Sequence, residues 1–289
     1  MKLLVKFNLM FLLIFLAGLV GASLVARALL QEVALQDAAS HARRLIEKAD
    51  AVGADTADHV SPLLEIHLRS RFTPQVVSAF AAAEVLALFQ KNAPEYSYKA
   101  AMLNPTNPRD SASDWEEDLI GQFRNTPDLK ESVGQRDTPA GASLYVARPI
   151  RIADRACLAC HTTPELAPHS MVERYGPSNG FGWKLGETLG AQIVTVPLEV
   201  PMRRARQALA VVVGLLAAVF LALGAALNLM LWSLVIRPVS RLSAIADRVS
   251  MGEQAAEFET GSRDEIGVLS ASFGRMRRSL EHAMAMLDA

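Results

Sequence analysis

The sequence predicts an α+β domain that lies between two transmembrane helices and is followed by a pair of amphipathic helices. Two uncharged apolar stretches, residues 7–26 and 207–236, are each long enough to cross a bilayer. Between them, helical patterns come first and strand patterns follow, which is typical of the α+β class. After the second stretch, apolar residues recur at heptad spacing over residues 237–289.

The charge balance excludes one class of partner. The chain has 29 Lys and Arg residues against 30 Asp and Glu, a formal net charge of −1. It therefore lacks the polycationic character that binding to nucleic acid requires. Because the apolar residues concentrate in the two long stretches, the composition indicates a membrane protein with a water-soluble middle segment.

The first apolar stretch, residues 7–26, predicts a transmembrane helix. Lys2 and Lys6 precede it, and positive residues that flank a span favour the cytoplasmic side, so residues 1–6 are expected in the cytoplasm. A cleaved signal peptide is the alternative, because Ala26-Arg27-Ala28 resembles a small-x-small cleavage site. A retained anchor is favoured, since the apolar stretch exceeds the usual length of a signal-peptide core.

Residues 27–206 predict one domain that is large enough for its own core. Apolar residues at helical spacing predict a helix over residues 29–58, and a second helical run follows two prolines. Strand patterns come next, separated by turn-rich segments. The second helix is expected at 75–91, the strands at 96–103, 143–152 and 190–198, and the turns at 104–114, 134–141 and 162–182.

The second apolar stretch, residues 207–236, is longer than a bilayer requires and predicts another transmembrane helix. Asn228 is its one strongly polar interior residue, and an isolated, tolerated amide is favoured over a helix–helix hydrogen bond. Trp232 and Arg237 are typical of an anchor at the cytoplasmic interface. Both chain ends are therefore expected in the cytoplasm, with the spans in a bacterial inner membrane and residues 27–206 in the periplasm.

The residues beyond the second span predict two amphipathic helices that need partners. Apolar residues alternate at spacings of four and three in each helix. Gly252 and Gly261 interrupt the connector between the helices. Two such helices per chain form a four-helix bundle in a parallel homodimer. The apolar positions are Val235, Val239, Leu242, Ala246 and Val249, then Ile266, Leu269, Phe273, Met276, Leu280, Ala283 and Leu287.

Three features of this region point to a known module. Pro238 lies just inside the membrane, Phe258 lies in the glycine-containing connector, and Asp264-Glu265-Ile266-Gly267 opens the second helix. With these residues the region resembles a HAMP domain, which implies a relay from a transmembrane helix to a cytoplasmic partner. A dimerisation device without a signalling role is the alternative. Since the chain stops at Ala289 without a kinase, cyclase or methyl-accepting segment, the output is expected from a separate protein; a remnant that has lost its output is the alternative.

The pentad Cys157-Leu158-Ala159-Cys160-His161 has the Cys-x-x-Cys-His spacing of c-type haem attachment. Two thioethers can hold the vinyl groups of the porphyrin while the adjacent histidine binds the iron as its proximal ligand. These two cysteines are the only ones in the chain. The sequence therefore predicts one covalently bound haem c per chain, held by Cys157, Cys160 and His161.

Two other roles for the cysteine pair are disfavoured by its surroundings. A structural disulfide or a thioredoxin-like pair normally sits where a strand enters a helix. This pair instead follows the polar turn at residues 150–155 and leads to Pro164 and Pro168. A zinc site would need about four ligands and usually a second Cys or His pair, which the sequence lacks.

Four further segments accompany the pentad, at residues 96–99, 104–110, 147–150 and 180–187. Together with it they resemble the bacterial family of membrane-anchored, single-haem c-type domains, which HAMP often follows. The resemblance covers most of residues 40–198. It implies a PAS-like antiparallel sheet of five strands flanked by a long N-terminal helix, with haem held outside the membrane for redox or gas sensing.

The resemblance leaves open which group binds the iron opposite His161. Some relatives use a cysteine on the early helix, and this chain has none there. His59 lies about where that group would fall and is the first choice. An open iron would favour a gas sensor, a bis-histidine iron a low-potential redox sensor, and a methionine a higher potential. The alternatives to His59, in falling order, are His67, Met102, His169 and His41.

These features predict a membrane-bound, non-enzymatic haem sensor that detects redox state or a small gaseous ligand. In the expected relay, the second transmembrane helix moves, the HAMP bundle repacks, and a cytoplasmic partner reads the change. A membrane-tethered periplasmic electron-transfer cytochrome is the main alternative. Peroxidase-like chemistry at an open iron is a third hypothesis, and it would require a distal acid or base such as His67.

Overall fold

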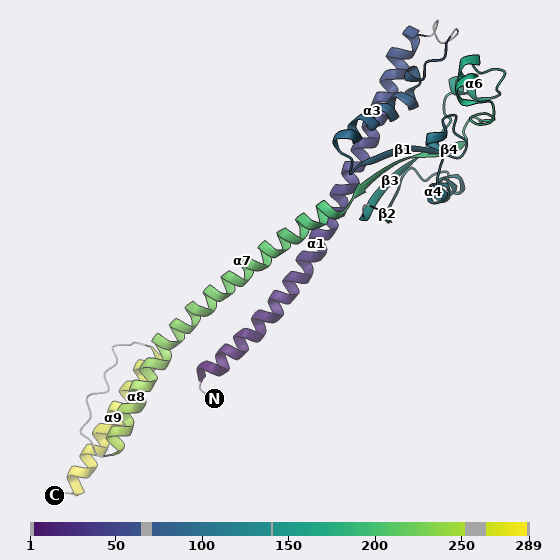
Figure 1. Cartoon of the computed structure of the whole chain (residues 1–289). Coiled ribbons are helices and arrows are strands. Elements are labelled where there is room, and N and C mark those ends of the chain that lie inside the picture. The colour runs from purple at the N-terminus through teal and green to yellow at the C-terminus, as the bar shows by residue number, and fades with distance from the viewer. Residues whose placement is uncertain (1–2, 65–70, 140, 252–263, 288–289) are drawn as a thin grey trace. The chain divides into compact units, whose positions relative to one another are not determined.

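The computed structural model describes residues 3–64, 71–139, 141–251 and 264–287, and it divides into two compact units (Figure 1). One unit, Ala26–Leu209, contains the whole sheet. The other combines Met1–Val25 with Ala210–Ala289. The limits of the domains predicted above stay predictions, and each unit is described by itself.

The sheet of the first unit confirms the predicted α+β class with antiparallel pairing. Four strands form it in the order β1-β4-β3-β2, and every neighbouring pair is antiparallel. The described residues thus hold four strands where the family resemblance implied five, and the PAS-like fold itself stays a prediction. The strands are β1 (Ser97–Met102), β2 (Ser132–Thr138), β3 (Gly141–Arg151) and β4 (Thr188–Pro197).

Helix α1 (Leu3–Asp55) covers one face of this sheet. Its Ala38, Ala42 and Ile46 recur at helical spacing, are buried, and belong to one cluster with Val146 of β3 and Val194 of β4. The predicted helix over residues 29–58 is the later part of α1, which ends in a π turn at Thr56–Val60. The small alanines allow the helix to approach the strands closely.

Helix α4 (Asp114–Asn125) covers the opposite face. Its buried Ile120 and Phe123 pack with Ala147 of β3 and Ile193 of β4. Successive residues of a strand point to opposite faces, so β4 sends Val194 to the α1 side and Ile193 to the α4 side. This explains why β4 reads as an almost continuous apolar run. Both cores share β4, and they also share β3 through Val146 and Ala147.

Three of the four strands were predicted from the sequence, whereas the prediction of a turn at residues 134–141 was wrong. There β2 runs along the sheet edge and pairs with β3. Its composition is polar, but the Tyr145 ring lies over Gly134 and the Arg136 guanidinium stacks 3.8 Å from the centroid of Trp115. These contacts come from distant residues, which is why the local pattern missed the strand.

Two helices flank the sheet region with small differences from prediction. The run expected at residues 75–91 is helix α3 (Ser78–Asn92), preceded by a 3₁₀ turn at Pro74–Val76. The segment at 162–182, expected to be a turn, contains the short helix α6 (His169–Tyr175).

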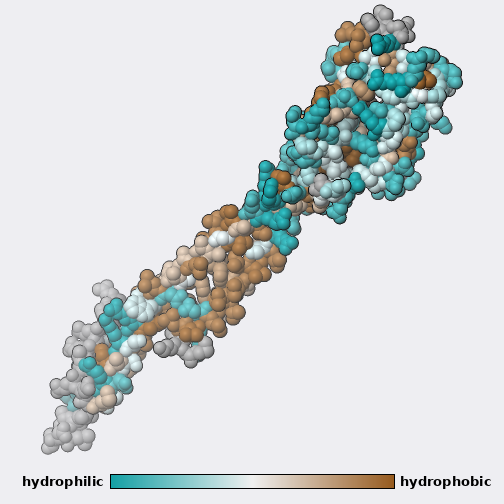
Figure 2. Space-filling view, in the orientation of Figure 1, coloured by the Kyte–Doolittle hydropathy of each residue, from teal (hydrophilic) through white to brown (hydrophobic). Residues whose placement is uncertain are grey.

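The second unit packs the N-terminal part of α1 against helix α7 (Glu199–Leu231). Asn8 and Asn228 donate a side-chain hydrogen bond to each other, at 2.9 and 2.7 Å, so the expectation of an isolated amide at Asn228 was wrong. Next to this pair, the Phe11 ring lies against Gly224, the only buried residue of α7. Both helices are long and apolar enough to cross a membrane, and Figure 2 shows their apolar surface.

After a π turn at Trp232–Ile236, the chain continues into helices α8 (Arg237–Ser250) and α9 (Glu265–Leu287). Leu242 of the predicted heptad is buried in α8, whereas Leu269 and Met276 of α9 are exposed. An exposed apolar stripe on an amphipathic helix is typical of a surface that a second copy covers. The predicted connector lies largely outside the described residues.

Candidate functional site

The pentad lies on one helical turn beyond the end of β3. A 3₁₀ turn (Arg155–Cys157) leads into α5 (Leu158–His161), and the Asp154 side chain accepts a hydrogen bond of 2.8 Å from the Ala156 N–H. Cys157 and Cys160 are free and partly buried. Since residues three apart lie on the same face of a helix, both thiols are presented on one side of the turn.

Burial raises the pKa of both thiols, and the Asp154 carboxylate adds to the effect at Cys157. A thioredoxin-like pair depends on the opposite shift, because its nucleophile is a stabilised thiolate. The site therefore favours thiols that stay protonated until they react with a bound group.

The His161 ring is held in one orientation. Its Nδ1 lies 2.7 Å from the carbonyl oxygen of Gly180 and 3.4 Å from the hydroxyl of Thr106. The carbonyl can only accept, so Nδ1 carries the proton and the Nε2 lone pair is available to a metal. Burial lowers the pKa of His161, which favours the neutral imidazole that a metal ligand must be.

The Trp183 indole stacks on the His161 ring, with centroids 3.9 Å apart and planes inclined by 11°. Its Nε1–H is buried and has no hydrogen-bond partner among the described residues. A buried donor without an acceptor is costly, so this nitrogen is a natural contact for an acceptor on a bound group.

Hydrogen bonds between two loops fix the Gly180 carbonyl, which orients His161. The Asn104 side chain accepts from the Gly180 N–H at 2.8 Å and donates to the Phe181 carbonyl at 3.0 Å. Gly180 is buried with a φ of +82°, and a Cβ there would lie 2.8 Å from Thr106 Cα. Only glycine suits this position. The family-like segments at 104–110 and 180–187 thus meet at the pentad.

None of the predicted distal ligands within the described residues makes a hydrogen bond or ion pair with the pentad. His59 is on the exposed π turn after α1, with its side chain 76% exposed and Nδ1 3.3 Å from Asp55. His169 and His41 are also exposed and each faces a carboxylate one helical turn away, whereas Met102 is at the end of β1. His67 lies outside the described residues. No contact in the described structure joins His59 to the pentad, and its role stays a prediction.

Sequence analysis missed the positioning roles of Asn104, Thr106 and Gly180. Their segments carried the family resemblance, but the individual roles depend on two loops that lie about 75 residues apart in the chain and meet only in the fold. An Asn-Pro-Thr turn and a Gly-x-Gly-Trp turn were the available signals.

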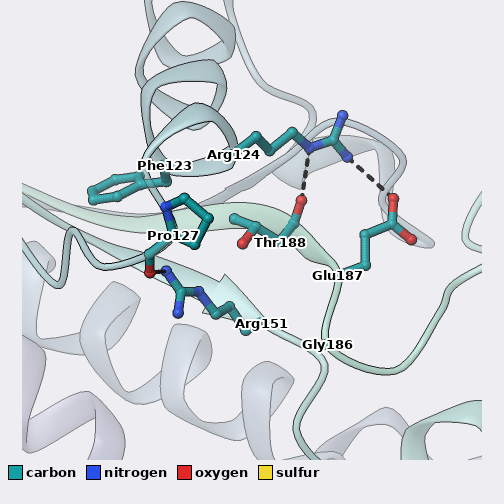
Figure 3. Close-up of a pocket in the computed structure, with 7 residues that line it drawn as sticks. All are labelled: Phe123, Arg124, Pro127, Arg151, Gly186, Glu187 and Thr188. Atoms are coloured by element: carbon teal, nitrogen blue, oxygen red, sulfur yellow. Dashed lines mark hydrogen bonds and ion pairs between the residues drawn. The ribbon is translucent and has the colours of Figure 1, made fainter.

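A cleft of about 400 Å³ lies between α4, the end of β3 and the start of β4 (Figure 3). Its two arginines are already used for structure. Arg124 donates to the Thr188 carbonyl at 2.8 Å and pairs with Glu187 at 3.3 Å, while Arg151 donates to the Pro127 carbonyl. Arg124 holds the turn that connects the Trp183 loop to β4, and Arg151 holds the end of β3 to the segment after α4.

The comparisons with known proteins identify the class as a haem-protein-like domain followed by a HAMP domain. Residues 31–197 match the family model described as Tll0287-like, and residues 230–282 match the HAMP domain model. Because the first match spans more than half of the 289 residues, the chain belongs to the Tll0287-like family.

Among solved structures, the chain is similar to the crystal structure of the cyanobacterial heme-protein Tll0287. The two sequences are 19% identical, the alignment covers 56% of this chain and 95% of that chain, and the TM-score is 0.42. A search of curated proteins found no match.

Proposed function

We propose that this chain is a membrane-bound sensor that carries one covalent haem c in a periplasmic domain and signals through HAMP to a separate cytoplasmic protein. The observation that carries the proposal is the donor set on one helical turn. Cys157 and Cys160 present two thiols beside His161, whose Nδ1 is tied to the Gly180 carbonyl and whose Nε2 is free. Attachment by two thioethers and one imidazole requires this donor set.

The residues around the pentad fit a haem. The unpartnered Nε1–H of Trp183 offers a donor to a propionate, and the Gly180 carbonyl would make His161 a more basic ligand. Bound haem would supply an iron centre whose oxidation state or ligation changes with the stimulus. Through the Gly180 carbonyl and Trp183, the position of His161 would be coupled to the loop that Asn104 holds.

The proposed relay uses the chain connection from the site to the membrane. The loop that holds His161 leads into β4, and β4 leads into α7. Leu198, between them, is buried, and its N–H donates to the Ala142 carbonyl at 2.9 Å. A displacement of the Gly180–Trp183 loop would therefore reach the start of α7 through one strand, and α7 continues into the HAMP helices.

Haem attachment is tested by staining for haem peroxidase activity after denaturing electrophoresis. The full chain, co-expressed with a cytochrome maturation system, should retain the stain, and the Cys157→Ala/Cys160→Ala variant should lose it. An unstained wild-type band would overturn the proposal.

His59 is proposed as the distal ligand, with His67, Met102, His169 and His41 as alternatives in that order. Magnetic circular dichroism of the oxidised protein should show a bis-histidine iron that His59→Ala abolishes. His41→Ala is the matched control, because it also removes an exposed histidine that faces a carboxylate one turn away. If both variants keep the bis-histidine signal, neither His59 nor His41 is the distal ligand.

An electron-transfer cytochrome is the alternative function of the same haem. Measurements of carbon monoxide binding and of electron exchange with a soluble periplasmic cytochrome distinguish the sensor from the electron carrier. Rapid exchange without any change in the HAMP helices would favour the electron carrier.

A further inference from the structure

A second cleft, of about 540 Å³, lies between α1 and the first turns of α7, entirely within the unit Ala26–Leu209. Its volume is within the range of small-molecule sites. From α1 it is lined by Arg27, Leu30 and Gln31, and from α7 by Met202, Ala205, Arg206 and Leu209.

The lining has two chemical characters. Leu30, Met202 and Leu209 are partly buried and form an apolar surface. Arg27 and Arg206 are exposed, and both border the same space. A ligand that fits this cleft therefore combines an apolar body with a negatively charged group.

The two cleft arginines have no counter-charge in the described chain. No described carboxylate lies within ion-pair distance of either, and the Arg206 side chain makes only a long bond of 3.4 Å to the Met202 carbonyl. Two other arginines of the same unit are paired, Arg43 with Glu131 at 2.8 Å and Arg124 with Glu187 at 3.3 Å. The cleft therefore offers two guanidinium groups to an anion from outside the chain.

The position of the arginines along the chain indicates the source of that anion. Arg27 directly follows the apolar stretch at residues 7–26, and Arg206 directly precedes the one at residues 207–236. Both guanidinium groups are therefore expected at the depth of the lipid headgroups. Guanidinium binds phosphate in a bidentate manner. Leu209 lies about one turn from Arg206 toward the membrane span and suits the upper acyl carbons, whereas Leu30 and Met202 lie about one turn from the arginines on the other side.

We propose that this cleft binds one anionic phospholipid, with its phosphate between Arg27 and Arg206 and its upper acyl chain against Leu209. The lipid would link α1 to α7 where both helices leave the membrane. The lipid site does not depend on haem, so a failed test of lipid binding would leave the proposed sensor function untouched, and the reverse also holds.

The test is native mass spectrometry of the full-length protein in detergent, titrated with phosphatidylglycerol or with phosphatidylcholine. Wild type should retain phosphatidylglycerol preferentially. The Arg27→Gln/Arg206→Gln variant should bind it about thirtyfold more weakly. The matched control is Arg203→Gln/Arg204→Gln, which removes the same charge from exposed α7 residues outside the cleft and should keep most of the affinity.

Each alternative result contradicts the proposal. Equal retention of the two lipids would exclude an anion site. Equal losses of phosphatidylglycerol affinity in the two Arg→Gln double variants would show diffuse charge attraction instead of binding in the cleft. Displacement of the lipid by millimolar inorganic phosphate would assign the site to free anions. Arg27→Lys/Arg206→Lys should keep the charge and most of the binding, and circular dichroism with haem absorbance verifies that each variant is folded.

Discussion

The orientation of His161 depends on a backbone carbonyl, and that carbonyl depends on Asn104. The imidazole is bonded to Gly180, while Asn104 bonds both the N–H of Gly180 and the carbonyl of Phe181. Asn104, which has no described hydrogen bond to His161, thus controls the hydrogen bond that would set the basicity of His161 as a ligand.

Replacing Asn104 with alanine should raise the midpoint potential of the haem. The variant loses two hydrogen bonds and about 1–3 kcal/mol of stability, and the loosened Gly180 carbonyl makes His161 a weaker donor to the oxidised iron. Spectroelectrochemical titration measures the shift. Asn107→Ala is the control, because Asn107 accepts only a local hydrogen bond of 3.3 Å from the Arg109 N–H. Equal potentials in the two variants would contradict the positioning role.

Gly180→Ala should destabilise the domain more than Gly182→Ala. Both glycines have a positive φ, +82° and +77°, so each alanine costs about 1–2 kcal/mol of backbone strain. At Gly180 the new Cβ also meets Thr106, whereas at Gly182 nothing lies within 4 Å. The clash adds about 1–3 kcal/mol. Chemical denaturation of both variants measures the difference in the free energy of unfolding. Equal losses would show that backbone strain, and not the clash with Thr106, accounts for the destabilisation.

At the scale of the elements, β4, like β3, contributes side chains to both cores of the sheet. It contributes Val194 and Val196 to the core under α1 and Ile193 to the core under α4. Its residues were predicted from the sequence because they are apolar and β-branched on both faces. The edge strand β2 was missed because its stability comes from Tyr145 and Trp115, which no local window includes.

The helix pair of the second unit contains a polar contact whose loss can be measured. Asn8→Leu or Asn228→Leu should each lower stability in detergent by about 1 kcal/mol, because the partner amide loses its interhelical bonds and keeps only the bond to a carbonyl of its own helix, Leu4 or Gly224. The double variant should lose less than the sum of the single losses. Ser23→Ala is the control, since the Ser23 hydroxyl bonds only the Leu19 carbonyl of its own helix. Strictly additive losses would refute the coupling.

At the scale of the whole molecule, the order of parts was predictable, but the architecture of the site was not. Apolar length predicted the spans, heptad spacing predicted the C-terminal helices, and the pentad predicted the donor set. The contacts of Asn104 with the Gly180 loop and of Trp183 with His161 could not be predicted, because they depend on how distant turns close on each other. Periodicity and spacing describe residues that are near in sequence.

If the haem state is relayed to HAMP, Leu269→Cys should cross-link across the dimer at different rates in the oxidised and reduced protein. Leu269 is exposed on α9 at a predicted heptad position, so a cysteine there would face the partner helix. The control combines Leu269→Cys with Cys157→Ala and Cys160→Ala, which removes haem attachment and should make the rate insensitive to the oxidant. Identical rates in the haem-loaded protein would contradict the relay.

The burial of Leu198 decides where the haem domain can be cut from its anchor. Leu198 and Met202 pack under α1 with Val196, although they lie beyond the last strand, so the opening turn of α7 belongs to the globular core. A water-soluble fragment prepared for crystallography should therefore end after Met202. Truncation at Pro197 would remove Leu198 and Met202, expose the apolar core under α1, and favour aggregation.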